Sequence, residues 1–189
     1  KGLTLPLMSY GGSAILMSHL GRPKGQVNPA MSLGPVAKHL AGLLGRPVQF
    51  ATDCIGEQAR AKAAALEPGE VLLLENLRFH PEEEQGDEVF SMALAALGDV
   101  YVNDAFGTAH RAHASTTIVA RHFPDAKLFG YLVSSELTSL AKVLDRPEKP
   151  LCAVVGGAKV SSKIEVLRNL LVKCDELIIG GGMAFTFIK

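Results

Sequence analysis

The amino-acid sequence predicts an α/β fold: a doubly wound parallel sheet in a Rossmann-like three-layer α/β/α arrangement, followed by the beginning of a second α/β domain. Two observations favour this class. Apolar runs of strand length alternate with helical patterns, and the runs are continuous, which is typical of strands buried on both faces of a parallel sheet. With 189 residues, 48% of them hydrophobic, the chain is long enough to bury a core without disulfides.

Six apolar runs are predicted to be strands. In chain order they are Ser13–Ser18, Pro47–Ala51, Val71–Glu75, Val100–Asn103, Leu151–Val155 and Glu176–Ile179. In doubly wound proteins, ligands bind beyond the carboxyl ends of the strands. The loops that follow these runs are therefore where functional residues are expected.

Helical patterns fill the segments between the strands. We expect helices over Ser32–Leu44, from Asp53 to about Leu66, over Asp87–Leu97 and over Ser134–Leu144. Gly45 and Gly98 are typical helix stops, and Asp53 is a suitable N-cap. Periodicity thus predicts one helix after nearly every strand.

The chain divides after the last of these helices, where the charged, proline-containing segment Asp145–Pro150 precedes a new strand. We expect a first domain over residues 1–133, a connecting helix over 134–146 and the start of a second domain over 147–189. One strand–helix–strand unit is too small to close a core. The second domain is therefore predicted to be truncated at Lys189.

Composition excludes several classes of protein. Three cysteines without a CxxC pair exclude a disulfide scaffold and a four-thiolate zinc site, and they favour a reducing, cytoplasmic location. No apolar stretch is long enough to span a membrane. The formal net charge is zero, although residues 1–52 contain five basic residues and no acidic one. With no tryptophan and few aromatic residues among these bases, a small anionic ligand is favoured over nucleic acid.

Basic residues follow three strands of the first domain, at the point where each strand ends. They lie in the segments His19–Gly25, Glu75–Phe79 and Asn103–His113, and the arginines and histidines among them are His19, Arg22, Arg78, His110, Arg111 and His113. Arginine offers a planar pair of donors that suits carboxylate or phosphate. Because parallel strands end at the same edge of a sheet, we expect these side chains to line one anion site.

Other interpretations of these loops stay open. The segment His19–Gly25 is also consistent with a surface turn that carries solvated basic residues. The spacing of His110 and His113 is also found in metal sites, but no third ligand is evident. The acidic run Glu82–Glu84 is predicted to be a solvated loop.

Glycine-rich segments follow the last two strands. Gly156–Lys163 precedes a helix, and Ser162 with Glu165 matches a capping box. Amides at a helix N-terminus and two lysines suit a nucleotide phosphate, although neither a Walker A motif nor GxGxxG occurs. Gly180–Gly182 allows close packing against a planar ring. A helix cap with solvated lysines and an ordinary tight turn explain these two segments equally well.

Five motifs give the sequence a family resemblance. In chain order they are SHLGRPKG, LLLENLRF, NDAFGTAHRAH, GGAKVSSKIEVL and GGGMAFTF, within residues 13–189. In this order they resemble phosphoglycerate kinase of the bacterial type. The resemblance implies an N-terminal domain that binds 3-phosphoglycerate and a C-terminal nucleotide-binding domain. It also implies a glycolytic transferase that moves a phosphoryl group reversibly between 1,3-bisphosphoglycerate and ADP, giving 3-phosphoglycerate and ATP.

The same resemblance assigns roles to individual residues. Lys159 would be catalytic and would neutralise the transferring phosphoryl group. The residues implied in substrate binding are His19, Leu20, Gly21, Arg22, Arg78, His110, Arg111 and His113. Those implied in nucleotide binding are Gly156, Gly157, Lys163, Gly180 and Gly181.

The resemblance also implies what lies outside this chain. The family's first strand, with its aspartate, asparagine and following catalytic arginine, has no counterpart here, and Lys1–Tyr10 departs from the family pattern. Magnesium, bound as Mg-ATP or Mg-ADP, would have its protein ligands beyond Lys189. We therefore expect the chain alone to be inactive. The full-length enzyme is expected to be cytoplasmic and monomeric, without nucleic-acid or membrane partners.

The rival interpretation is a binding module that holds an anion without transferring a group. Lys159 and Lys163 favour an enzyme, because a domain that only binds a triose phosphate has no need of two lysines on a second domain. Turnover distinguishes the two.

Overall fold

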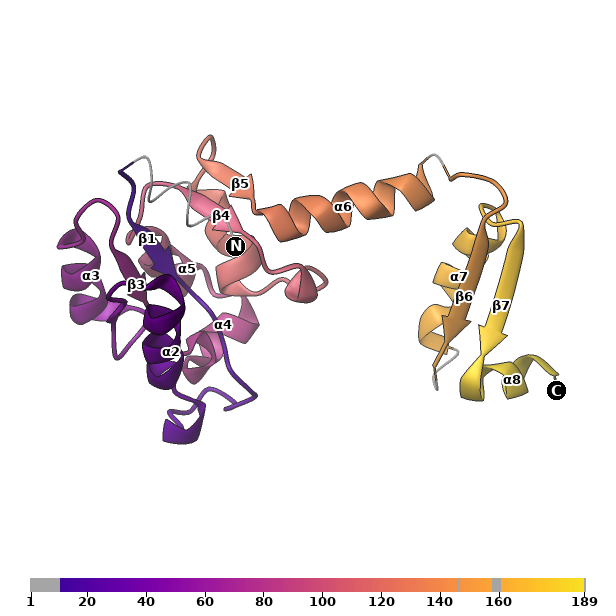
Figure 1. Ribbon diagram of the computed structural model, residues 1–189. Helices are drawn as coiled ribbons and strands as arrows, with labels where there is room; N and C mark the ends of the chain where they lie inside the picture. The colour runs from indigo at the N-terminus through magenta and orange to yellow at the C-terminus, as the bar shows by residue number, and fades with distance from the viewer. Residues whose placement is uncertain (1–10, 146, 158–160, 189) are drawn as a thin grey trace. The chain divides into compact units, whose positions relative to one another are not determined.

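The computed structural model describes residues 11–145, 147–157 and 161–188, and it shows two compact units, the first ending at Ser134 and the second beginning at Ser135 (Figure 1). The division falls within helix α6 (Tyr131–Leu144), which begins three residues before the predicted connecting helix. Each unit combines parallel strands with helices.

The first unit contains two parallel sheets. Strand β3 (Val71–Leu73) lies between β1 (Ala14–Leu16) and β2 (Gln49–Phe50), and β4 (Tyr101–Asn103) pairs with β5 (Lys127–Phe129). All these pairings are parallel, so the predicted α/β class is confirmed. Strand β5 was not predicted, because its three residues are exposed and form no apolar run.

Helices pack around these strands. They are α2 (Gly34–Leu44), α3 (Gly56–Ala64), α4 (Pro81–Gln85) and α5 (Glu88–Ala95). The core forms between the strands and α5, where the fully buried Leu72 and Leu74 lie in one cluster with Phe90 and Leu94. Gly45 takes the left-handed conformation (φ 65°) at the end of α2, as its position as a helix stop predicts.

Two local predictions in this unit are wrong. Helix α3 begins at Gly56 and not at Asp53, because the Asp53 carboxylate accepts a hydrogen bond from the Cys54 amide (2.6 Å) and lies 2.7 Å from Nε2 of His80. The run Glu82–Glu84 is not a solvated loop: it lies in α4, and Glu83 is buried.

The second unit is a small strand–helix–strand arrangement. Strands β6 (Cys152–Gly156) and β7 (Glu176–Gly180) pair in parallel, with helices α7 (Ile164–Leu171) and α8 (Ala184–Ile188). A 3-10 turn (Ser161–Lys163) precedes α7, and Lys163 stands immediately before the helix without a side-chain cap, while the predicted capping box involves a Ser162 side chain outside the described part of the chain.

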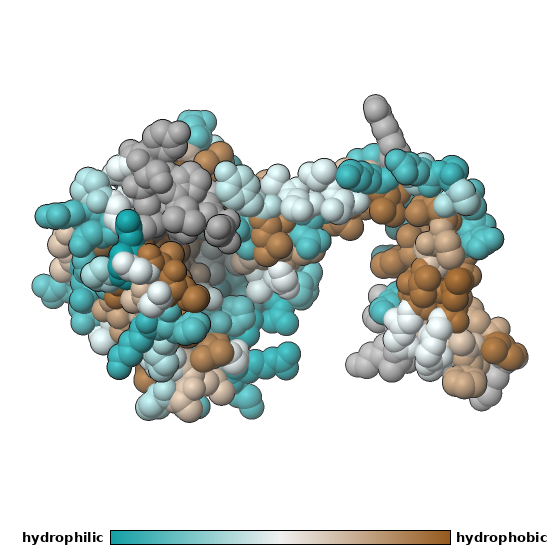
Figure 2. All heavy atoms as spheres, viewed as in Figure 1, coloured by the Kyte–Doolittle hydropathy of each residue, from teal (hydrophilic) through white to brown (hydrophobic). Residues whose placement is uncertain are grey.

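The second unit buries little. Among its described residues only Leu167 and Met183 are buried, whereas Val154 and Ile178 in the two strands are 73% and 53% exposed. Figure 2 shows apolar side chains gathered over these strands. In the part of the chain that the structure describes, no helix combines the length and the apolar character needed to cross a bilayer.

Candidate anion-binding site

The loop after β1 is held in place by the segment that follows β3. Asn76 is fully buried, and its amide donates hydrogen bonds to the carbonyl oxygens of Leu20 (2.8 Å) and Met31 (2.9 Å). The guanidinium of Arg78 donates to the carbonyl oxygen of Gly21 at 3.0 Å. The first two predicted loops are therefore one hydrogen-bonded assembly.

Replacing Asn76 by Ala is expected to lower the free energy of unfolding by about 2–3 kcal/mol, because two carbonyl oxygens and the Arg78 amide lose their buried partner. Asn28→Ala is the matched control. It removes one exposed cap contact to the Ala30 amide, and it should cost less than about 1 kcal/mol. Urea denaturation followed by circular dichroism measures both, and equal losses would contradict the structural role given to Asn76.

Glu75 ties the same strand end to helix α2. Its carboxylate accepts hydrogen bonds from the backbone N–H groups of Leu33 (2.8 Å) and Asn76 (2.7 Å) and from the Ser32 hydroxyl (2.6 Å). Sequence reasoning assigned no role to Glu75 or Asn76. The available signal was their position, since two polar residues directly continue the most apolar strand of the chain.

The loop after β1 packs closely against Pro81 at its far end, at Gly25. Gly25 has φ 72°, its amide donates to the Arg78 carbonyl at 3.2 Å, and a Cβ there would lie 2.8 Å from Cβ of Pro81. A side chain at this position would strain the backbone, because φ is positive, and it would also clash with the ring of Pro81.

Gly25→Ala is therefore expected to destabilise the fold by about 1–3 kcal/mol. Gly42→Ala is the control, because Gly42 lies inside α2 with open space around it, and alanine there should stabilise by about 0.5–1 kcal/mol. Thermal melts of the two variants should shift in opposite directions. A Gly25→Ala melt at or above the parent value would show that the loop tolerates a side chain.

The loop after β4 carries the third group of residues that the sequence predicts for the anion site. His113 is buried, and its Nδ1 lies 3.6 Å from Oε1 of Glu83 in α4. Ser115 follows and donates to the same carboxylate from its amide (2.9 Å) and its hydroxyl (2.6 Å). Tyr101 in β4 donates its hydroxyl hydrogen to the Ser115 carbonyl at 2.8 Å. A buried acidic group thus anchors a basic loop.

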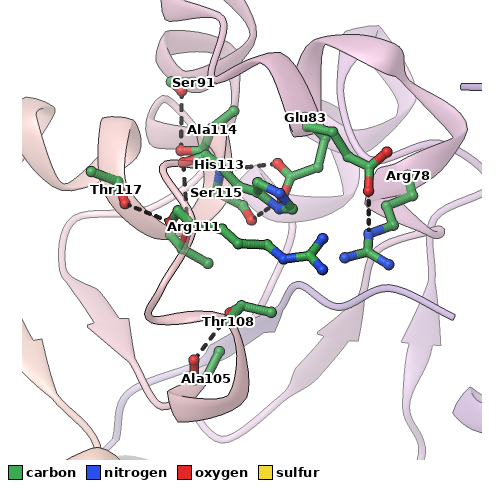
Figure 3. Close-up of polar contacts among 12 residues, drawn as sticks. Arg78, Glu83, Ser91, Ala105, Thr108, Arg111, His113, Ala114, Ser115 and Thr117 are labelled. Atoms are coloured by element: carbon green, nitrogen blue, oxygen red, sulfur yellow. Dashed lines mark hydrogen bonds and ion pairs between the residues drawn. The ribbon is translucent and has the colours of Figure 1, made fainter. Parts of the chain in front are cut away.

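The three loops converge around His19. Burial lowers the pKa of His19 below its usual value, and the positive charges of Arg78, His113 and Arg111 lower it further, while Glu84 opposes them. In Figure 3 the guanidinium groups of Arg78 and Arg111 point toward one another. Like charges gathered in this way are stabilised when an anion lies between them.

A cavity of about 440 Å³ opens beside this cluster. It is lined by β1, β4 and the loops that follow them, including His19, His113 and Ser115, and also by Leu77 and Glu83. Its volume is within the range of small-molecule sites. His19 and His113 belong to both the cavity and the basic cluster, so a small anion in the cavity can contact these two imidazoles.

Two predicted residues are placed less closely. Arg22 is exposed and forms no hydrogen bond or ion pair with any other described residue. His110 is exposed and lies next to Arg111, whose Nε is 3.2 Å from its Nε2. Both lie on loops that carry residues of the cluster. Neither lines the cavity, and the cluster residues Arg78 and Arg111 do not line it either.

The glycine-rich loops of the second unit lie together. Gly156 and Gly180 are paired across β6 and β7, and a Cβ at Gly181 would lie 3.9 Å from the Gly157 nitrogen. Lys163 donates from Nζ to the Gly156 carbonyl at 2.6 Å. All five predicted nucleotide-site residues are thus neighbours. Lys159, the predicted catalytic residue, lies outside the described residues.

Metal-ligand side chains meet at another place. Among the described residues, one group of three such side chains lies together, with the ligand atoms of Asp53, Cys54 and His80 within 4.8 Å of one another. Burial raises the pKa of the Cys54 thiol, which keeps it protonated and a poor ligand. The hydrogen bond between His80 Nε2 and Asp53 Oδ1 (2.7 Å) explains the geometry without a metal.

Comparison with known proteins identifies relatives of the whole chain. A family model described as phosphoglycerate kinase matches residues 5–189. Phosphoglycerate kinases of Moorella thermoacetica and Chlorobium phaeovibrioides are 61% and 57% identical over 97% of this chain. The alignments cover 46% of each relative, so the chain spans about half their length.

Solved structures agree with the sequence comparisons. The structure of phosphoglycerate kinase from Coxiella burnetii is 42% identical with a TM-score of 0.85, and it matches 98% of this chain and 46% of its own. The enzyme from Pyrococcus horikoshii OT3 is 32% identical with a TM-score of 0.82, over 97% of this chain and 47% of its own. Sequence, fold and motif order agree, and the chain belongs to the phosphoglycerate kinase family.

Proposed function

We propose that this chain forms the 3-phosphoglycerate site and part of the nucleotide site of a phosphoglycerate kinase. The observation that carries the proposal is the convergence of His19, Arg78, Arg111 and His113 from three strand-end loops. The substrate has a carboxylate and a phosphate, and both suit a site of arginines and imidazoles. The exposed Arg22 and His110 would complete the site when the anion is bound.

The chemistry needs positioning and charge neutralisation more than acid–base groups. The acceptor is a carboxylate, which is already a nucleophile, so no general base is required. Arg78 and Arg111 would hold the substrate, and Lys159 would neutralise charge on the phosphoryl group in transit. The residues that would bind the nucleotide are Gly156, Gly157, Lys163, Gly180 and Gly181, and the Lys163 ammonium would turn from the Gly156 carbonyl toward the phosphates.

Magnesium would be held at this chain by the phosphates of the bound nucleotide and not by side chains of the described residues. The described part of the nucleotide site offers glycine amides and the Lys163 ammonium, which suit phosphate oxygens. Mg²⁺ prefers carboxylate and water oxygens. Its protein ligands would therefore lie outside this chain, and the bound metal would supply charge neutralisation at the phosphates.

A coupled assay tests the proposal on a completed chain, which we define as this chain joined to the segments of the Moorella thermoacetica enzyme that it does not match. ATP, magnesium and 3-phosphoglycerate should give ADP and 1,3-bisphosphoglycerate. A folded completed chain that binds 3-phosphoglycerate without turnover would favour the binding module, and one that binds neither ligand would contradict the proposal.

A further inference from the structure

The short acidic segment Pro81–Gly86 touches all three loops of the anion site. Its first residue packs against the loop after β1, where a Cβ on Gly25 would lie 2.8 Å from Cβ of Pro81. Its last residue packs against the loop after β4, where a Cβ on Gly86 would lie 2.6 Å from the Ala112 carbonyl oxygen. The segment is therefore wedged between the loops that carry the basic residues.

Glu83 fixes the third loop from this segment. Its side chain is buried, and it accepts two hydrogen bonds from Ser115 while Oε1 lies 3.6 Å from Nδ1 of His113. Figure 3 shows the carboxylate directed at both residues. A buried carboxylate is costly without such partners, so Glu83 and the loop hold each other in one arrangement.

Glu84 fixes the second loop. Its Oε1 lies 3.3 Å from Nε of Arg78, on a side chain that is 8% exposed. The same guanidinium donates to the Gly21 carbonyl from Nη1. Arg78 is thus held on two sides, through Nε and Nη1. Neighbouring glutamates of one helix orient residues of two different loops.

We propose that Glu83 and Glu84 are positioning residues for anion binding: they hold the His113–Ser115 segment and the Arg78 guanidinium at the geometry that the anion requires. The inference rests on the proposed function of the site and adds that its acidic neighbours serve it. Neither carboxylate is a ligand of the anion, since both are acceptors.

Electrostatics alone gives the opposite expectation, which makes the proposal easy to test. A carboxylate near an anion site repels the anion, so its replacement by neutral glutamine should tighten binding if the carboxylate has no other role. If the carboxylate positions the cations, the same replacement should weaken binding, because misplaced groups lose their charge-assisted contacts. The sign of the change separates the two accounts.

The experiment uses calorimetric titration of the completed chain and its Glu83→Gln, Glu84→Gln and Glu82→Gln variants with 3-phosphoglycerate and with ADP. We expect Glu83→Gln and Glu84→Gln to bind 3-phosphoglycerate roughly 10-fold more weakly with unchanged ADP affinity. Glu82 is the control, because it lies in the same helix and forms no hydrogen bond or ion pair with the three loops among the described residues. Glu82→Gln should bind as tightly as the parent or more tightly.

Each outcome bears on the proposal. If Glu84→Gln binds 3-phosphoglycerate as tightly as the parent or more tightly, the proposal is overturned for Glu84. The Glu84 side chain is exposed, so its replacement is not expected to disturb the fold. For the buried Glu83, an equal loss of both ligand affinities together with a lower melting temperature would show a purely structural role. A parent protein that binds no 3-phosphoglycerate would instead overturn the proposed function.

Discussion

Residues 1–189 by themselves are expected to transfer phosphoryl groups at least about 10³-fold more slowly than the completed chain. Removing one oriented cation from a phosphoryl-transfer site costs roughly 10³–10⁵ in rate. The chain spans 46% of the length of its Moorella relative, and under the proposed function the family's catalytic arginine and the magnesium ligands would lie in the remainder. A coupled kinase assay with both proteins at equal concentration measures the ratio.

The completed chain is the positive control for this assay, and its Lys159→Ala variant gives the effect of one missing cation. Lys159→Ala should lower the catalytic rate more than the nucleotide affinity, because the lysine meets charge that develops in transit. Turnover by residues 1–189 within about a hundredfold of the completed chain would mean that the catalytic groups are all present here.

Arg111→Ala is expected to weaken 3-phosphoglycerate binding by about 2–4 kcal/mol, and Arg22→Ala by a similar amount, because each removes a charge-assisted contact. Neither guanidinium supports the fold through an ion pair among the described residues, so the effect should appear in binding and not in stability. Lysine at either position should recover part of the loss, since an ammonium lacks the planar fork.

Calorimetry of the completed chain measures these affinities, and Arg60→Ala is the control. Arg60 is exposed on α3 and is absent from the charges that shift the pKa of His19. Its replacement removes the same charge and should leave binding within about twofold. If Arg60→Ala weakens binding as much as Arg111→Ala, the effect is one of net charge and the assignment of Arg111 fails.

The fold class was predictable because buried parallel strands leave a direct pattern in sequence. Residues 71–74 form a continuous apolar run, and the stop at Gly45 follows from a conformation that glycine alone adopts without strain. Strand β5 was missed because Lys127–Phe129 is a strand through its pairing with β4. Such pairing is a tertiary contact and leaves no periodicity.

The basic half of the candidate site was predictable, and the acidic half was not. His19 and Arg78 follow the paired strands β1 and β3, which end at one sheet edge, and Arg111 and His113 follow β4 of the second sheet. Glu83 looks like part of a solvated run in sequence, and its burial depends on Ser115 and His113, thirty or more residues later. Local charge patterns cannot reveal that kind of pairing.

Proton NMR of the six histidines tests most directly whether one anion site exists where three loops meet. Without ligand, the pKa of His19 should lie below its usual value, because burial and neighbouring cations favour the neutral ring. Adding 3-phosphoglycerate to the completed chain should raise this pKa and shift the resonances of His19 and His113, while those of His39, His80 and His122 stay in place. A titration in which His19 does not respond, or in which all six histidines respond alike, would contradict the site.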